Sequence, residues 1–170
     1  MINNNFKKIL KCLFTYTNET VNGLRLIGLN GTEISESSGG HHILPYLNTS
    51  LNTIINSDGI SSKVIGGVCI GFGAGSKQVS LEDYNLETII DNLSYQSSSV
   101  TTTKEGYIVT TSVKNNTSTD IIVSEVGIFC RGQNNDYIAS HPFMLTRNVL
   151  ETPITIMPNE IKTFTVIINF

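Results

Sequence analysis

The feature that most constrains the fold of this chain is a period-two alternation of apolar and polar residues in its C-terminal half. Segments 106–113, 121–131 and 161–170 place alternate residues on one face, as strands with one buried face do. Turn signals separate them at close to the roughly 8–12-residue spacing of antiparallel sandwiches, and no βαβ rhythm appears. The residues that would share a face are Tyr107, Val109, Thr111 and Val113, then Ile122, Val126 and Ile128, and finally Phe164, Val166, Ile168 and Phe170. The sequence therefore predicts an all-β fold, an antiparallel, jelly-roll-like β-sandwich.

The N-terminal part follows a different pattern. Residues 4–14 carry apolar side chains at i, i+3 and i+4 spacing, which predicts a short amphipathic helix. Residues 24–34 read as a hairpin with Asn30-Gly31 in a type I′ turn, and the spacing of apolar residues over 43–56 favours a second helix. We therefore divide the chain into an N-terminal helix, hairpin and connecting segment (1–60) and a β-sandwich domain (61–170).

The N-terminal helix would present an apolar stripe made of Phe6, Ile9, Leu10, Leu13 and Phe14. A stripe this wide is too apolar to face water, so it either packs on the chain's own sandwich or docks on another chain. The patterned strands after residue 106 supply a core of their own. We therefore favour docking and predict that these residues form an assembly interface.

The stretch "GVCIGFGAGSKQ" (67–78) raises the question of a phosphate-binding loop, because Gly71, Gly73 and Gly75 alternate ahead of a lysine. A Walker loop requires the lysine directly after the last glycine and a Ser or Thr after the lysine, and neither condition holds. A dinucleotide-binding fingerprint requires a different glycine spacing and an apolar helix after it. We interpret the stretch as a strand whose glycines let another backbone or a large side chain approach closely, before a turn.

Composition argues against several classes of function. Charged residues make up 15% of the chain and the net charge is −3, so there is no basic field for nucleic acid. No apolar run approaches the roughly 18 residues of a membrane-spanning helix, and no signal-peptide pattern is visible. We expect no metal, no cofactor and no disulfide framework, because no ligand spacing links the cysteines and histidines, which are Cys12, Cys69, Cys130, His41, His42 and His141.

A few polar residues stand out from this background. Glu125 interrupts an apolar strand, where it either points to solvent or accepts hydrogen bonds from backbone donors at a strand crossing; we favour a structural role over catalysis. Glu82 and Asp83 read as a solvated loop or as the first turn of a helix, and Arg147 as a surface or interface residue. We predict no catalytic residue in the chain.

Several segments together resemble virion proteins of tailed bacteriophages. "IGFGAGSKQVSLEDYNLE" is similar to a strand of the type hGxGxT followed by a polar stretch and D-x-x-L, and "DIIVSEVGIF" to an I-x-E-h-G-h-F strand. "LTRNVLETPITIMPNEIKTFTVIINF" resembles a closing R-x-x-h segment, then P-I-x-h-x-P-G-E and a long alternating strand. The ordered set covers roughly residues 65–170, and the opening segment is also similar. Asn159 stands where glycine is usual, and Ala74-Gly75-Ser76 replaces Gly-x-Thr; the resemblance brings no active site.

The resemblance implies a non-enzymatic building block of a tailed-phage virion or phage-derived particle, made in the host cytoplasm. We expect it to assemble with copies of itself and other virion proteins, in the tail, baseplate or fibre, with capsid decoration as an alternative. A different reading is a carbohydrate- or ligand-binding sandwich, in which loop tyrosines stack on a ligand such as a host-surface glycan. The tyrosines that would do so are Tyr84, Tyr95 and Tyr137.

Overall fold

The computed structural model describes residues 1–8, 26–34, 68–131 and 142–169 of the 170-residue chain. These ranges are mainly β-strand, with a helical turn at residues 4–8. The predicted all-β class is therefore confirmed for this part of the chain. The strands are β1 (Leu26–Ile27), β2 (Glu33–Ile34), β3 (Val68–Gly73), β4 (Leu93–Thr102), β5 (Gly106–Asn115), β6 (Ile121–Arg131), β7 (Pro142–Ile156) and β8 (Ile161–Asn169).

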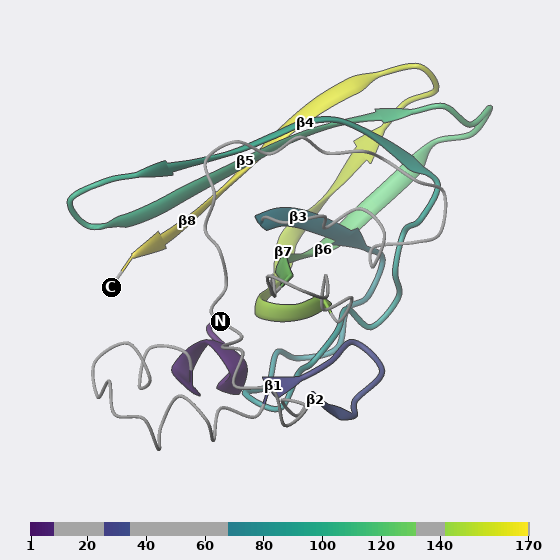
Figure 1. Cartoon of the computed structure of the whole chain (residues 1–170). Coiled ribbons are helices and arrows are strands. Elements are labelled where there is room, and N and C mark those ends of the chain that lie inside the picture. Colours follow the sequence, from purple (N-terminus) through teal and green to yellow (C-terminus); the bar gives the residue numbers. More distant parts are fainter. Residues whose placement is uncertain (9–25, 35–67, 132–141, 170) are drawn as a thin grey trace, which may run out of the picture.

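The longer strands form two three-stranded antiparallel sheets, ordered β3-β6-β7 and β4-β5-β8, while β1 and β2 form a separate pair. In Figure 1 the β4-β5-β8 sheet lies across the top, β3 lies beneath it, and the helical turn and the β1-β2 pair lie at the far end. No strand pairing joins the two sheets among the described residues. The antiparallel arrangement is therefore confirmed for the described residues, whereas the jelly-roll-like sandwich stays a prediction.

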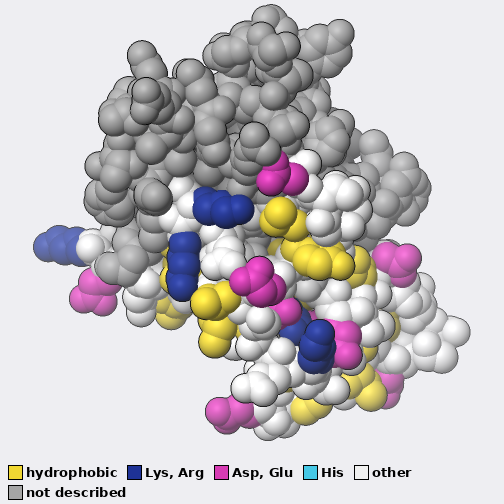
Figure 2. All heavy atoms as spheres, turned by 90° about the horizontal axis from the view of Figure 1, so that it is seen from below, with side chains coloured by type: hydrophobic (Ala, Val, Ile, Leu, Met, Phe, Trp, Pro, Cys, Tyr) yellow, Lys and Arg dark blue, Asp and Glu magenta, His cyan; other side chains and the backbone are white. Residues whose placement is uncertain are grey.

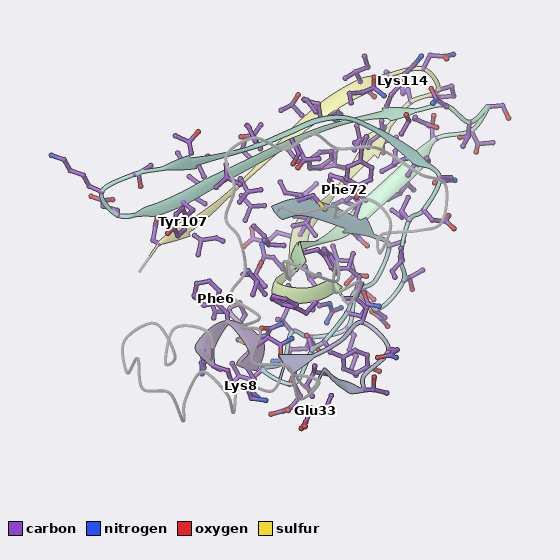
Figure 3. All side chains as sticks on the ribbon, viewed as in Figure 1. Phe6, Lys8, Glu33, Phe72, Tyr107 and Lys114 are labelled. Atoms are coloured by element: carbon purple, nitrogen blue, oxygen red, sulfur yellow. The ribbon has the colours of Figure 1, made fainter. Side chains whose placement is uncertain are left out.

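Aromatic side chains hold β3 against the second sheet. The ring of Phe72 lies 4.6 Å from that of Phe164 in β8 and 5.8 Å from that of Tyr95 in β4, measured between centroids. The Tyr95 hydroxyl donates a 3.0 Å hydrogen bond to the carbonyl oxygen of Ile70. Figure 3 shows Phe72 between β3 and the upper sheet. The main buried cluster of the described residues therefore lies between the sheets.

The predicted alternation is right for β5 and β8 and only partly right for β6. Val109, Thr111 and Val113 are buried on one face of β5, and Phe164 and Ile168 on one face of β8. In β6, however, Ile122 is 56% exposed, and every described side chain from Glu125 onward is buried. A register shift between Val123 and Glu125 separates these two parts of the strand. Phe170 lies outside the described residues.

The hairpin is present, but its turn differs from the prediction. A type I′ turn needs positive φ at both central residues, and among the described non-glycine residues only Asn159 has one. The amide of Gly31 instead donates to the carbonyl of Gly28, and the amide of Gly28 donates to the carbonyl of Thr32. With Gly31 at φ 78°, this is a three-residue loop, a tight turn followed by a left-handed glycine. Glycine supplies the left-handed position and leaves Asn30 at negative φ.

The N-terminal helical turn begins after Asn3, whose side-chain oxygen accepts a 3.2 Å hydrogen bond from the amide of Phe6. Asn5 binds both backbone groups of Ile27 at 2.8 Å and so attaches the hairpin to this turn. Phe6 points toward the sheets in Figure 3 and is buried in the chain's own core. The rest of the predicted stripe, Ile9, Leu10, Leu13 and Phe14, and the helix predicted over 43–56 lie outside the described residues.

Candidate functional site

Four ionisable side chains from three parts of the chain meet beside β3. Arg147 in β7 donates from Nε to Oε2 of Glu125 in β6 at 2.7 Å. Its Nη1 donates to Asp83 at 3.0 Å, and its Nη2 lies 3.7 Å from Oε2 of Glu87. Asp83 and Glu87 belong to the loop between β3 and β4. We call this group the Arg147 cluster.

Glu125 also holds the loop that follows the glycine strand. Its Oε1 accepts hydrogen bonds from the amide of Gly75 at 3.1 Å and from the amide of Thr88 at 3.0 Å. Gly73 lies opposite Glu125 in the β3–β6 register. A Cβ at Gly73 would meet the Glu125 carboxylate and lie 2.7 Å from the Thr88 carbonyl oxygen. The side chain of Glu125 therefore takes the space that a side chain at Gly73 would fill.

The two loop carboxylates also order their own backbone. Oδ2 of Asp83 accepts a 2.8 Å hydrogen bond from the amide of Ser80. Oε2 of Glu87 accepts from the amides of Ser76 and Lys77, at 2.8 and 2.7 Å. These two backbone hydrogen bonds are the main reason that the pKa of Glu87 is lowered from its ordinary value. The loop backbone is thus held by these two carboxylates.

The first residues of the chain bind β7 next to the Arg147 cluster, along the edge of β7 that faces away from β6. The amino group of Met1 donates to the carbonyl oxygen of Arg147, and the amide of Arg147 donates to the carbonyl of Met1. Ile2 pairs with Thr146 as an antiparallel bridge. Burial lowers the pKa of the Met1 amino group, against the opposing attraction of Asp83. Residues 1–3 therefore cover the outer edge of β7 at the Arg147 cluster.

The electrostatics of the cluster favour a permanently charged arginine. The Arg147 side chain is 2% exposed, and burial acts to lower its pKa. The hydrogen bonds and charges of Glu125 and Asp83 oppose burial, and the guanidinium pKa ends above its ordinary value. Nη2 has no hydrogen-bond partner among the described residues. A buried pair of this kind costs desolvation free energy, and its clearest effect is to fix which elements come together.

A cleft of about 430 Å³ adjoins the cluster. Its lining includes Lys77, Tyr84 and Glu87 from the loop, together with Arg147. The carboxylates of the cluster already accept hydrogen bonds from backbone amides or from Arg147. In the described ranges, no three His, Cys, Asp or Glu residues are grouped as a metal site. The arrangement fixes strands and a loop.

The interpretation of Arg147 as a surface or interface residue is wrong, because the side chain is buried inside the chain's own fold. Asp83 is also not simply solvated, since its side chain is 13% exposed and binds Arg147. Glu82 is exposed and accepts a hydrogen bond from Asn4, as a loop residue would. The available signal was the pair of charged residues, Glu125 and Arg147, each inside an apolar strand.

The glycines predicted as turn and strand residues lie where β3 ends. Gly71 and Gly73 are buried in β3, paired with Gly127 and Glu125, and Gly75 is buried just after it. A Cβ at Gly75 would lie 2.6 Å from Cβ of Glu87. A second backbone also approaches, since the amide of Ala74 donates to the carbonyl of Thr88 at 2.8 Å.

The other candidates are scattered. Tyr84 is exposed on the loop, whereas Tyr95 is buried in the core, so Tyr95 is not a stacking platform. Burial, with a further contribution from Cys69, raises the pKa of Tyr95 well above 10. Cys69 is buried. Cys130 belongs to β6. The candidates outside the described residues are Tyr137, Cys12, His41, His42 and His141.

A second, larger groove of about 670 Å³ runs between β8 and the β6-β7 face. Its lining consists of Met1, Ile2, Val126, Gly127, Ile128, Thr146, Asn148, Leu150, Ile154 and residues 163–169 of β8. None of these residues has a charged side chain. On the face shown in Figure 2, by contrast, acidic and basic side chains of the described residues are interspersed.

No protein-family model, curated protein or solved structure matches this chain significantly. The described ranges contain no helix with the length and hydropathy needed to cross a bilayer.

Proposed function

We propose that this chain is a non-enzymatic structural component of a tailed-phage virion or phage-derived particle, located in the tail, baseplate or fibre. It acts by assembling with copies of itself and with other virion proteins. The two sheets are the layers of an antiparallel, jelly-roll-like sandwich, with Phe72, Tyr95 and Phe164 between them. Capsid decoration is the alternative location.

The observation that carries this proposal is the meeting of the sequence motifs at one buried cluster. Gly75 comes from the hGxGxT-like strand, Asp83 from the D-x-x-L segment, Glu125 from the E-h-G-h-F strand and Arg147 from the R-x-x-h segment. These residues bind one another directly. Motif residues that serve the fold are expected of a building block, whereas an enzyme's motifs would meet at an accessible reacting centre.

The P-I-x-h-x-P-G-E-like segment near the end of the chain also contributes to the fold. Asn159, which stands where the resembled family has glycine, adopts a φ of 64° in the turn between β7 and β8. Its amide donates to the carbonyl of Asn115 at 2.8 Å. The buried Asn115 side chain in turn donates to the carbonyls of Thr119 and Ile156, both at 2.8 Å. The motif residues here join two turns, which again supports a scaffold.

Immuno-electron microscopy of purified particles, with an antibody against this chain, tests the proposal. We expect label on the tail, baseplate or fibres; label spread over the capsid would support decoration instead. An Arg147→Met chain should be missing from particles because it folds poorly, and Lys104→Ala, in the exposed turn between β4 and β5, should still be incorporated. A chain that is abundant in the host yet absent from purified particles would overturn the proposal.

A further inference from the structure

The outer edge of β8 is unpaired among the described strands, since β8 ends the sheet order β4-β5-β8. The pairing of β8 with β5 shows which residues of β8 direct their amide and carbonyl groups toward β5 and which direct them outward. Asn115 lies opposite Glu160 by extension of the Lys114–Ile161 register, and its amide donates to the Glu160 carbonyl at 3.0 Å. Hydrogen-bonded and non-bonded pairs alternate in an antiparallel ladder. The even-numbered residues of β8 therefore bind β5, and the odd-numbered residues direct their amides and carbonyls outward.

The close approach of Gly106 to the carbonyl group of Ile168 agrees with this assignment of inward and outward groups. A Cβ at Gly106 would meet the carbonyl oxygen of Ile168, which places that carbonyl on the β5 side. Thr163, Thr165 and Ile167 are exposed, so their side chains lie on the outer face of the sheet while their backbone groups face the open edge. The outward-directed set is Ile161, Thr163, Thr165, Ile167 and Asn169.

The edge of β8 lacks the devices that normally prevent edge pairing. The strand has no proline, and its register with β5 has no bulge, whereas β4 at the other edge is irregular between Tyr95 and Ser97. Its one charged residue, Lys162, binds the carbonyl of Thr155 and the carboxylate of Glu160. Ile161 and Ile167 are 58% and 62% exposed on it. A long, regular edge with a single, already bound charge is a template for another strand.

The edges of the other sheet are partly covered by the chain itself. The outer edge of β3 is met by the segment around Ile89, by the Tyr95 hydroxyl and by Thr111. Residues 1–3 pair with β7 near Arg147. An open edge of this length is therefore not a general feature of the described strands, and β8 differs from β3 and β7 in this respect.

The large groove runs along this edge. It is lined by every residue from 163 to 169, although alternate side chains of a strand point to opposite faces. A consecutive run of this kind faces a groove only along the strand's edge. The other side chains of the lining, from β6, β7 and the first two residues, are uncharged. A strand laid on β8 would thus meet backbone groups at its side and uncharged side chains beneath.

We propose that β8 pairs antiparallel with β8 of a second copy of this chain, with Thr165 on the two-fold axis. In this register Ile161 faces Asn169 of the second copy, Thr163 faces Ile167, and Thr165 faces its own counterpart. Every outward-directed amide and carbonyl of both strands then has a partner. Shifting the register by two residues leaves unpaired groups at both ends.

Charge favours a second copy as the occupant. The groove carries no charged side chain, and β8 itself offers a nearly uncharged strand to fill it. Lys162 falls opposite Ile168 of the second copy, so no like charges face each other across the pairing. The β4-β5-β8 sheets of the two copies then join into one continuous six-stranded sheet. This is the isologous contact of a two-fold dimer.

A charge exchange at Thr165 tests this register, because a residue on the two-fold axis faces itself. Light scattering after size exclusion should give the full-length chain twice its own mass. Thr165→Lys and Thr165→Glu should each be monomeric alone, since like charges then meet at the axis, and an equimolar mixture should recover the dimer. Ser99→Lys, exposed on the outer face of β4 at the far edge of the sheet, is the matched control and should stay dimeric. Thermal melting of each variant verifies that it is folded.

A monomeric wild-type chain, or folded Thr165→Lys and Thr165→Glu variants that remain dimeric alone, would overturn the pairing. The inference deepens the proposed function by naming the partner and the surface, but it does not depend on the particle. A monomeric chain still found in particles would refute the β8 pairing alone. A dimeric chain absent from particles would refute the proposed function alone.

Discussion

Nε of Arg147 donates a 2.7 Å hydrogen bond to Oε2 of Glu125, and both side chains are buried. The two residues come from the neighbouring strands β6 and β7, and Glu125 carries the contact on to the loop after β3. Through this pair, a bond between two side chains sets the position of a third strand. We therefore expect the fold to be sensitive to single changes at this pair.

Removing both partners of this pair should cost less than the sum of the two single removals. We expect Arg147→Met to lower the free energy of unfolding by about 3–5 kcal/mol, because it leaves the Glu125 carboxylate buried without its cation. The double variant with Glu125→Leu should be less destabilised than the sum of the two single variants. Urea denaturation of the four chains measures this coupling. Additive losses would contradict the assignment of the two side chains as a pair.

Two substitutions at Glu125 should separate its hydrogen bonds to the loop amides from its ion pair with Arg147. Glu125→Gln keeps an oxygen for the amides of Gly75 and Thr88 but places an amide group against Arg147. Glu125→Ala removes both sets of contacts and should therefore be the more destabilised of the two in the same urea series. Equal, negligible losses in the free energy of unfolding would mean that the contacts of the Glu125 side chain do not stabilise the fold.

Gly73 should not tolerate a methyl group, whereas Gly127 should tolerate one better. At Gly73 the added Cβ would meet the Glu125 carboxylate and the fixed backbone oxygen of Thr88. At Gly127 it would meet the ends of Phe129, Met144 and Leu86 at 2.9–3.1 Å, and flexible side chains can move. We expect Gly73→Ala to cost at least about 1–3 kcal/mol. Comparison of the two melting curves tests the difference, and a neutral Gly73→Ala would refute the close approach.

Asn159→Gly should leave stability unchanged or raise it slightly, by up to about 1 kcal/mol, because Asn159 adopts a left-handed φ of 64°. Asn159→Val should lower the free energy of unfolding by about 1–2 kcal/mol, since a β-branched residue is strained there. Both variants keep the backbone amide that binds Asn115. Chemical denaturation of the pair provides the test, and a stabilising Asn159→Val would be incompatible with this turn.

Alkaline pH should destabilise the fold through Tyr95. Burial raises the pKa of its phenol well above 10, so the folded state favours the neutral form. The stability due to this preference is complete below the unfolded-state pKa near 10 and is lost as pH rises above it. Urea midpoints between pH 8 and about 11 should fall more steeply for the wild type than for Tyr95→Phe. Tyr84→Phe, at an exposed position, should retain the wild-type slope; a Tyr95→Phe chain with that same slope would contradict the mechanism.

The strands of this protein were predictable because strand signals are local. A two-residue period survives in the sequence whatever lies opposite, so the buried faces of β5 and β8 were correctly predicted. The hairpin was also predictable, but its turn type depended on the φ angle of Asn30, which the dipeptide Asn30-Gly31 does not determine. Ile122 shares the alternation of β6 but lies on the exposed side of a register shift, which has no signal in the strand's own residues.

The all-β class, the alternating faces and the glycine strand could be predicted, because each follows from neighbouring residues and backbone geometry. The burial of Arg147 among Asp83, Glu87 and Glu125, by contrast, could be learned only from the folded chain. These partners lie 22 to 64 residues from Arg147 in the sequence. Which charges meet depends on strand order and register. A charged residue in an apolar strand shows that a partner is needed, but not which one, because hydrophobic burial and hydrogen bonding select the partner only once the sheets have formed.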